Sequence, residues 1–250
     1  SAASDVYKRQ ADTVTTSMEE AVKDADIVVS AVPVEAMESV FTEMAPFLKS
    51  DAVVTDVGST RQTVIAAARK GLGDKFHQYA PAHPIAGGEM PGVDYASADL
   101  FDEKVVISTP DEGMDPKVVT FIEEAWRKAG ARVQAMSPLQ HDLTFASVSH
   151  LPHVLAYALV DMIAREENAQ EKLKMAGAGF RDFTRIASSS PVMWRDICLS
   201  NREALSHELK RYRASLDTLQ KYIDESDGKA LESVFENAVR NRRGLVFPGK

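Results

Sequence analysis

The sequence predicts an α/β domain with a mostly parallel sheet, followed by an all-α domain. Up to about residue 136, short β-branched runs alternate with helical patterns, which is typical of βαβ units. After Ser137-Pro138 no further strand pattern occurs, and helical patterns run almost to the end of the chain. We therefore expect a partial α/β domain over residues 11–137 and a helical domain over residues 138–250.

Two continuous apolar runs are the strongest strand candidates. Residues 27–34 read IVVSAVPV and residues 52–58 read AVVTDVG, as expected for strands that are buried on both faces. An amphipathic pattern follows each run, the first to Leu48 and the second to Ala68. Further strands are expected at 78–80, 105–109 and 131–136, and further helices at 17–23, 116–129, 139–164, 179–186, 191–223 and 228–242. This order predicts a doubly wound (Rossmann-type) sheet.

The start of the chain departs from a complete domain of this kind. A doubly wound dinucleotide-binding domain opens with a strand, a G-x-G-x-x-G turn and a helix whose N-terminus holds the pyrophosphate. None of the 13 glycines precedes Gly58. We therefore expect an incomplete dinucleotide-binding domain that lacks the Gly-rich loop, a non-native leader over residues 1–10, and weak or no binding of NAD or NADP by this chain.

The bulk composition narrows the function classes. The net charge of −8, without a segregated basic patch, argues against nucleic-acid and anionic-membrane partners. A single cysteine, Cys198, excludes an internal disulfide and Cys-rich zinc modules. No signal peptide is evident, and the longest uncharged stretch, 145–160, contains two histidines and a proline, unlike a membrane span. We expect a soluble, cytoplasmic enzyme.

The carboxyl ends of the first two predicted strands could face a nicotinamide cofactor, because ligands of open α/β sheets bind outside those ends. The alternative for the first strand is an ordinary buried strand stopped by proline. For the second, Ser59 with Gln62 also fits a capping box at a helix start. The candidate cofactor contacts are Ser30, Ala31, Val32, Pro33, Asp56, Val57 and Gly58.

A histidine in the stretch PAHPIAGGE, residues 81–89, is a candidate general base. His83 lies after a short predicted strand and before a Gly87-Gly88 turn that permits close approach of a ligand. A histidine near its ordinary pKa can take a proton from a hydroxyl group at neutral pH. An ordinary surface-loop histidine is an equally good interpretation of this stretch alone.

The second domain opens with HDLTFASVSHLPH, residues 141–153, which holds three of the six histidines. His150 and His153 would share a helical face, but H-x-x-H without a third ligand argues against a metal site. Imidazoles that bind a carboxylate substrate are a better interpretation, with core histidines as the alternative. Further on, GFRDFTRIA provides Arg181 and Arg185, and arginine is suited to bidentate carboxylate binding.

Together these segments resemble the prephenate and arogenate (cyclohexadienyl) dehydrogenase family of tyrosine biosynthesis. The resemblance covers nearly the whole chain after about Ala11 and rests on AVPV, DVGST, AHPIAGGE, SHLPH and FTRIASSSPVMWRDI in this order. It implies a catalytic histidine at His83, an assisting serine at Ser59, a substrate-binding histidine at His153 and a carboxylate-binding arginine at Arg185. It also implies NAD or NADP as cofactor.

The chemistry that the resemblance implies is an oxidative decarboxylation. His83, oriented by Ser59, would accept the proton of a ring hydroxyl while the ring carbon delivers hydride to the nicotinamide, and loss of CO₂ would make the ring aromatic. Arg185 and His153 would hold carboxylates and so fix the reacting carbon. The sequence discriminates neither prephenate from arogenate nor NAD from NADP, since no counterpart of the ribose-reading acidic residue occurs.

Two other functions stay open, and one assembly is expected. The chain could be a paralogous hydroxy-acid dehydrogenase or imine reductase of the same architecture, or an inactive fragment that cannot hold cofactor. A homodimer is expected because apolar residues recur at helical spacing from Leu205 to Ile223. The members of this stripe are Leu205, Leu209, Tyr212, Leu216, Leu219 and Ile223.

Overall fold

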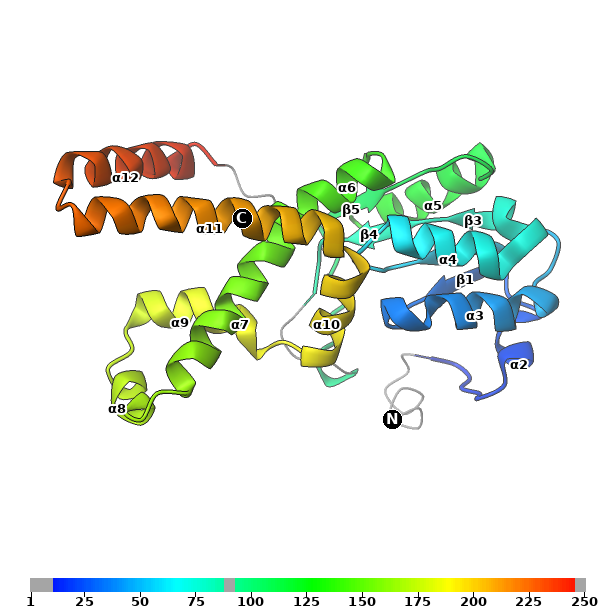
Figure 1. Cartoon of the computed structure of the whole chain (residues 1–250). Helices are drawn as coiled ribbons and strands as arrows, with labels where there is room; N and C mark the ends of the chain where they lie inside the picture. Colours follow the sequence, from blue (N-terminus) through cyan, green and yellow to red (C-terminus); the bar gives the residue numbers. More distant parts are fainter. Residues whose placement is uncertain (1–10, 88–92, 246–250) are drawn as a thin grey trace.

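The computed structural model describes residues 11–87 and 93–245 and divides them into an α/β part and a helical part. Figure 1 shows the strands and helices α2 to α5 gathered on one side, and helices α7 to α12 extending away from them. The predicted leader, residues 1–10, lies outside the described residues, as do Gly88 and Glu89 of the His-Pro stretch and the last five residues. The predicted fold class is confirmed.

The α/β part contains two three-stranded sheets. In the first, β1, β2 and β3 pair in parallel in that order. In the second, β5 pairs in parallel with β6 and antiparallel with β4, so His83 lies opposite Ile107. The strands are β1 (Ile27–Ser30), β2 (Val53–Asp56), β3 (Tyr79–Ala80), β4 (Ala82–Pro84), β5 (Val105–Ser108) and β6 (Arg132–Ala135). His83 is therefore part of a strand, not of the loop expected after one.

Helices connect and cover these strands. The larger cluster of buried hydrophobic residues lies between the first sheet and its helices, and includes Phe41, whose ring meets that of Tyr79 edge-on at 5.6 Å. Such packing of apolar helix faces against strands stabilises the domain within one chain. The elements are α2 (Met18–Val22), η1 (Val34–Ala36), α3 (Met37–Met44), η2 (Ala45–Phe47), α4 (Gln62–Leu72), η3 (Gly73–Gln78), η4 (Val93–Tyr95) and α5 (Pro116–Lys128).

The expectation that the first strand is buried on both faces is wrong. Ile27 and Val29 on β1 are 42% and 53% exposed. Among the described residues β1 pairs only with β2, so it is an edge strand, and these two side chains point to a face that nothing covers. The predicted run is also shorter in the structure, because η1 begins at Val34 directly after Pro33.

The remaining described residues are helical. Ser137 caps α6 through its side chain, and a π-helical turn, η5, joins α6 to α7 at His150. Asn201 interrupts the helix expected over 191–223 and so separates α10 from α11. The elements are α6 (Pro138–Phe145), η5 (Ala146–His150), α7 (Leu151–Ala164), α8 (Ala169–Lys174), α9 (Ala178–Thr184), η6 (Arg185–Ser188), α10 (Pro191–Ser200), α11 (Arg202–Asp224) and α12 (Gly228–Arg243).

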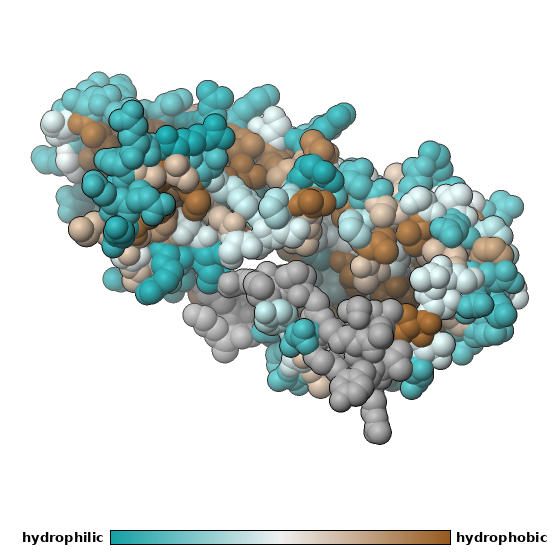
Figure 2. All heavy atoms as spheres, turned by 90° about the horizontal axis from the view of Figure 1, so that it is seen from below, coloured by the Kyte–Doolittle hydropathy of each residue, from teal (hydrophilic) through white to brown (hydrophobic). Residues whose placement is uncertain are grey.

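The helical part leaves much apolar surface uncovered within one chain. Helices α11 and α12 form a hairpin that projects from the rest of the molecule (Figure 1), and of their residues only Leu205 is buried. Leu216, Ile223 and Phe235 are 46%, 58% and 55% exposed. In Figure 2, hydrophobic residues are interspersed with hydrophilic ones over this half of the molecule. These side chains provide the surface expected for association with a second chain.

One helical run is long and apolar enough to cross a membrane by length and composition alone. It spans Pro138–Ala164, with 22% of its most apolar window buried. The same run contains His141, Asp142 and His150, all three of them buried and hydrogen-bonded within the protein. These polar groups tie the run to the rest of the fold rather than to lipid.

Candidate active site

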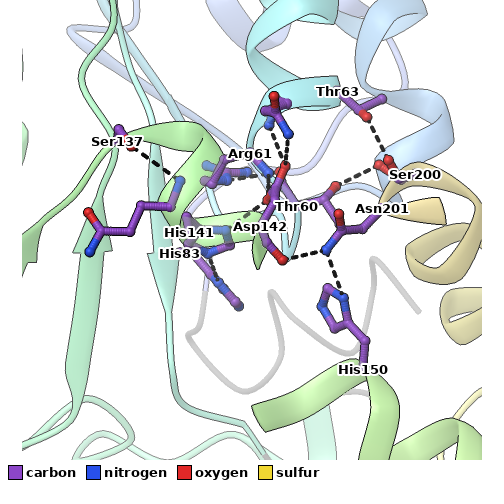
Figure 3. A network of polar contacts seen from close by, with 12 residues as sticks. Thr60, Arg61, Thr63, His83, Ser137, His141, Asp142, His150, Ser200 and Asn201 are labelled. Atoms are coloured by element: carbon purple, nitrogen blue, oxygen red, sulfur yellow. Dashed lines mark hydrogen bonds and ion pairs between the residues drawn. The ribbon is translucent and has the colours of Figure 1, made fainter. Parts of the chain in front are cut away.

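The candidate site lies where the start of α4 meets α6 and the junction of α10 with α11 (Figure 3). The carboxylate of Asp142 accepts hydrogen bonds from the backbone amides of Arg61 (2.8 Å) and Gln62 (2.9 Å). These are donors that a helix start leaves without intrahelical partners. The predicted capping box is therefore wrong: α4 begins at Gln62, and its cap comes from Asp142, 80 residues away in sequence.

Further hydrogen bonds join the two domains beside this cap. Asn201 donates from Nδ2 to the backbone oxygen of Asp142 at 2.8 Å. The hydroxyl groups of Thr60 and Ser200 lie 2.7 Å apart, and the Thr63 hydroxyl donates to the backbone oxygen of Ser200 at 3.0 Å. The turn between β2 and α4 is thus fixed against the helical domain by several independent contacts.

His83 joins the same network through a second histidine. Nδ1 of His83 lies 2.7 Å from Nε2 of His141, and Nδ1 of His141 lies 2.9 Å from the carboxylate of Asp142. His141 is stacked on Phe145 with ring centroids 4.4 Å apart, and the His83 ring is 4.9 Å from the same phenyl ring. The three polar side chains thus form a chain of hydrogen bonds from a buried carboxylate to the predicted base.

The electrostatics of this chain favour neutral imidazoles beside an ionised carboxylate. Burial lowers the pKa of His83 well below 6.5, and electrostatic interactions with His141, Arg61 and His150 lower it further. Burial also lowers the pKa of His141. The hydrogen bond to Asp142 and the charge of that carboxylate raise the pKa, but by less than burial lowers it. Burial alone would raise the pKa of Asp142, but hydrogen bonds from His141 and the two amides outweigh it and lower the pKa.

A buried ion pair supports the turn before α4. Arg61 and Asp56 are both 0% exposed, and their side chains meet at 2.6 Å. Tyr79 donates its hydroxyl proton to the same carboxylate, and the amide of Gly58 donates to it at 2.7 Å. A Cβ atom at Gly58 would lie 2.8 Å from the Arg61 guanidinium, so this glycine is required by close packing against the ion pair.

The predicted cofactor contacts lie at the carboxyl ends of β1 and β2, where ligands of parallel sheets bind. Ala31 and Pro33 are exposed and Val57 is half-buried, so these residues can contact a ligand directly. The other four residues face inward. Asp56 and Gly58 lie beside the buried Arg61–Asp56 ion pair. The Ser30 hydroxyl lies 3.3 Å from the Met37 sulfur, and Val32 packs against the hydrophobic core.

Ser59 lies on the turn between β2 and α4 and is half-buried. Within residues 11–87 and 93–245, His83 makes its side-chain hydrogen bond to His141 and not to Ser59. The position of Ser59 beside a strand end still permits contact with a ligand. Its role as the assisting serine stays a prediction.

His153 and Arg185 form the other side of the site. The His153 ring is stacked on Trp194 with centroids 3.6 Å apart, and its Nδ1 donates to the backbone oxygen of Ser149 at 2.9 Å. Burial lowers the pKa of His153, and the charge of Arg185 lowers it further. Arg185 itself is exposed at the start of η6. Helix α7, which carries His153, packs against η6, which begins at Arg185.

His150 connects the two sides. Its Nδ1 accepts from Asn201 Nδ2 at 3.2 Å, its ring meets Trp194 edge-on at 6.1 Å, and burial lowers its pKa to about 4. Asn201, which also donates to the backbone oxygen of Asp142, therefore links His150 to the Asp142 network, and Trp194 contacts the rings of both His150 and His153. Among the described residues no group of three His, Cys, Asp or Glu side chains could hold a metal ion.

Two family models match most of the chain. The family model for the prephenate dehydrogenase nucleotide-binding domain matches residues 2–135, and that for the prephenate dehydrogenase dimerization domain matches residues 137–237. The chain belongs to the prephenate dehydrogenase family. The family match shows that the first domain binds a nucleotide cofactor and that the second domain forms a homodimer, as predicted.

Individual members of the prephenate dehydrogenase family are clearly similar to this chain. It is 38% identical to the cyclohexadienyl dehydrogenase of Zymomonas mobilis, over 94% of this chain and 80% of that protein. It is 35% identical to the prephenate dehydrogenase of Bacillus subtilis, over 92% of this chain and 62% of that longer protein. The crystal structure of A. aeolicus prephenate dehydrogenase with hydroxyphenyl propionate and NAD+ superposes with a TM-score of 0.88, at 34% identity over 97% of this chain and 85% of that one.

Several site residues were not singled out from the sequence. His141 and Asp142 stood within the quoted histidine stretch but received no role, and Arg61, Trp194 and Asn201 were not considered as parts of the site. The available signal was the His-Asp pair itself, because adjacent imidazole and carboxylate groups often share a proton network. Nothing in the sequence alone indicates that this pair reaches His83, 58 residues away along the chain.

Proposed function

We propose that this chain catalyses the oxidative decarboxylation of prephenate, arogenate or both, with a nicotinamide cofactor as hydride acceptor. The observation that carries the proposal is the location of His83. It is a neutral imidazole, bonded through Nδ1 to a buried histidine, in the same locality as the His153–Arg185 pair. This arrangement supplies a base and an anchor for a carboxylate, the two groups that the reaction requires.

Each residue has a role that follows from its surroundings. Arg185 and His153 would bind carboxylate groups and hold the reacting ring carbon in position. His83 would accept the hydroxyl proton at Nε2, with Ser59 as an assisting hydrogen-bonding group. The cofactor, when bound, supplies the hydride acceptor. The strand ends from Ser30 to Pro33 and from Asp56 to Gly58 would contact its nicotinamide side.

Several finer points are part of the same proposal. The domain limits are residues 11–137 for the nucleotide-binding domain and 138–250 for the helical substrate-binding and dimerisation domain. NAD and NADP are both proposed as acceptors. We also propose that the enzyme is soluble and cytoplasmic, in keeping with its charge of −8.

Turnover with matched substrates tests this function. Prephenate and arogenate are each incubated with NAD+ and with NADP+, and the reduced cofactor and the CO₂ released are both measured. We expect at least one combination to yield the two products in a one-to-one ratio. A 3-hydroxy acid and a cyclic imine serve as substrates for the rival dehydrogenase and reductase functions. Turnover of either with no turnover of prephenate or arogenate would reject the proposal.

A further inference from the structure

The hydrogen bonds around Asp142 define where the protons of the two histidines lie. The backbone amides of Arg61 and Gln62 can only donate, so the Asp142 carboxylate is an acceptor on both oxygens. An ionised carboxylate also accepts from its remaining neighbour, which makes Nδ1 of His141 a donor at 2.9 Å. The proton of a neutral His141 therefore lies on Nδ1, and its Nε2 has a lone pair.

The same reasoning carries on to His83. Nε2 of His141 accepts, so the ring nitrogen 2.7 Å away, Nδ1 of His83, must carry a proton and donate it. A neutral imidazole carries one proton, so Nε2 of His83 is then unprotonated. Within the described residues no protein group is hydrogen-bonded to this Nε2. It is the nitrogen available to a substrate hydroxyl.

We propose that Asp142 and His141 are positioning residues that hold His83 in the tautomer whose Nε2 accepts the proton of the substrate. The inference rests on the proposed function, in which His83 is the base. It adds a specific reason why His83 is competent: the free imidazole has two tautomers, and only one of them leaves Nε2 unprotonated. Serine proteases use a carboxylate to the same end, since it fixes the tautomer of the catalytic histidine.

The surroundings make this tautomer a property of the folded chain. His141 is 0% exposed and Asp142 is 1% exposed, so water does not compete for their hydrogen bonds. Phe145 stacks on His141 and lies against His83, which fixes both ring planes. When His83 takes up the proton, its Nδ1–H still donates to His141, and the negative charge of Asp142 lies one imidazole away to stabilise the cation.

The chain of hydrogen bonds from Asp142 through His141 to His83 also crosses the boundary between the two domains. Asp142 belongs to the helical domain, yet it caps α4 of the nucleotide-binding domain and begins the chain of bonds that ends at His83. The orientation of the base therefore depends on correct docking of the helical domain. Figure 3 shows these contacts converging on Asp142.

Nitrogen NMR of histidine side chains tests the inference without cofactor or turnover. The chain is labelled with ¹⁵N-histidine, and the His83 signals are assigned by their loss in His83→Asn. At neutral pH we expect the wild-type chain to show a protonated Nδ1 and an unprotonated Nε2 at His83. In His141→Phe, which keeps an aromatic ring on Phe145 but removes the acceptor, a substantial fraction of His83 should carry its proton on Nε2. His77→Phe is the control, because His77 is exposed and its side chain is hydrogen-bonded to the Asp74 backbone oxygen, away from His83.

Two further variants keep the test decisive if His141→Phe does not fold. His141→Gln retains an acceptor oxygen and should restore much of the Nδ1–H form. Asp142→Asn removes the charge at nearly constant size and should leave the His141 proton divided between its two nitrogens. A wild-type His83 protonated on Nε2, or a His83 tautomer unchanged in the folded His141→Phe and Asp142→Asn variants, would overturn the inference.

Steady-state kinetics separates a positioning role from a merely structural one. In a form of the enzyme that turns over substrate, His141→Phe should lower kcat by about tenfold or more, with the about 10⁴-fold loss seen for a triad carboxylate as an upper limit. KM should change little, and His141→Gln should recover part of kcat. An unchanged kcat would reject the positioning role. An inactive wild type with the expected NMR result would instead reject the proposed function and leave the tautomer assignment intact.

Discussion

The two domains bury their apolar side chains to very different extents. Both clusters of buried hydrophobic residues, from Val22 to Ala131, lie in the nucleotide-binding domain. Helix α11, with 23 residues, buries only Leu205, and no residue of the 16-residue α12 is buried. The first domain is therefore stabilised mainly within one chain, whereas the helical domain completes its packing in the dimer that its family forms.

The candidate site divides along the same line. On one side, His83, His141 and Asp142 form a closed, mostly buried chain of hydrogen bonds. On the other side, Arg185 is exposed on a helical segment. The predicted base is thus oriented by the packed interior, whereas the predicted carboxylate-binding arginine is open to solvent. Variants in the two regions should accordingly change different properties.

The largest effect on stability is expected in the core of the first domain. Phe41→Ala removes a ring that is 0% exposed and packed on Tyr79, and should lower the free energy of unfolding by about 3–5 kcal/mol. Phe47→Ala is the control, because Phe47 is 37% exposed in the same domain. Urea unfolding followed by circular dichroism measures both. Equal midpoints for the two variants would contradict the assigned core.

Loss of the site arginine should act on substrate affinity. Arg185→Ala removes a charged hydrogen-bond donor worth about 1.5–3 kcal/mol, so KM should rise by about ten- to a hundredfold while kcat changes less. Arg181→Ala is the control, since Arg181 is also exposed but belongs to α9. If Arg181→Ala gave the large effect and Arg185→Ala none, the wrong arginine has been assigned.

A charge on the exposed apolar stripe of α11 should weaken the dimer. Ile223 is 58% exposed in the single chain, and burying an isoleucine at an interface contributes roughly 1.5–3 kcal/mol. Ile223→Glu should therefore raise the dissociation constant by about tenfold or more, as measured by sedimentation equilibrium. Thr218→Glu places the same charge on another face of α11. An equal effect of both variants would show that charge alone, and not this stripe, controls association.

The smallest effect is a dependence of stability on pH. Burial lowers the pKa of folded His150 from 6.5 to about 4. Below pH 6.5 the unfolded chain binds a proton that folded His150 does not, so the free energy of unfolding falls as the pH drops from about 6.5 towards 4. The slope is at most about 1.4 kcal/mol per pH unit for one histidine. Urea midpoints across this range test it, and His150→Gln should reduce the slope; identical slopes would contradict the shift.

The sequence predicted the order of helices and strands because apolar periodicity reports which residues are buried. It failed at β1, where IVVSAVPV has the composition of a strand covered on both faces but Ile27 and Val29 are exposed. It also failed at α4, because the Ser59–Gln62 spacing fits a local cap, whereas the observed cap is Asp142. A partner 80 residues away leaves no local pattern.

The candidate site was predictable where the functional group of a single side chain suggests its role. His83, His153 and Arg185 stood out because imidazole and guanidinium groups suit proton transfer and carboxylate binding. Their roles stay predictions. The hydrogen-bond chain behind His83 was not predictable. It depends on the packing of α6 against β4 and α4, which no pattern within either segment describes.

Replacement of the base tests the central claim most directly. His83→Asn, in a form of the enzyme that turns over prephenate or arogenate, should lower the rate by about 10²–10⁴-fold, because general-base catalysis is lost. Substrate binding, measured by calorimetry, should remain largely intact, because Arg185 and His153 are unchanged. A variant that keeps more than half of the parent rate would contradict the assignment of His83 as the base.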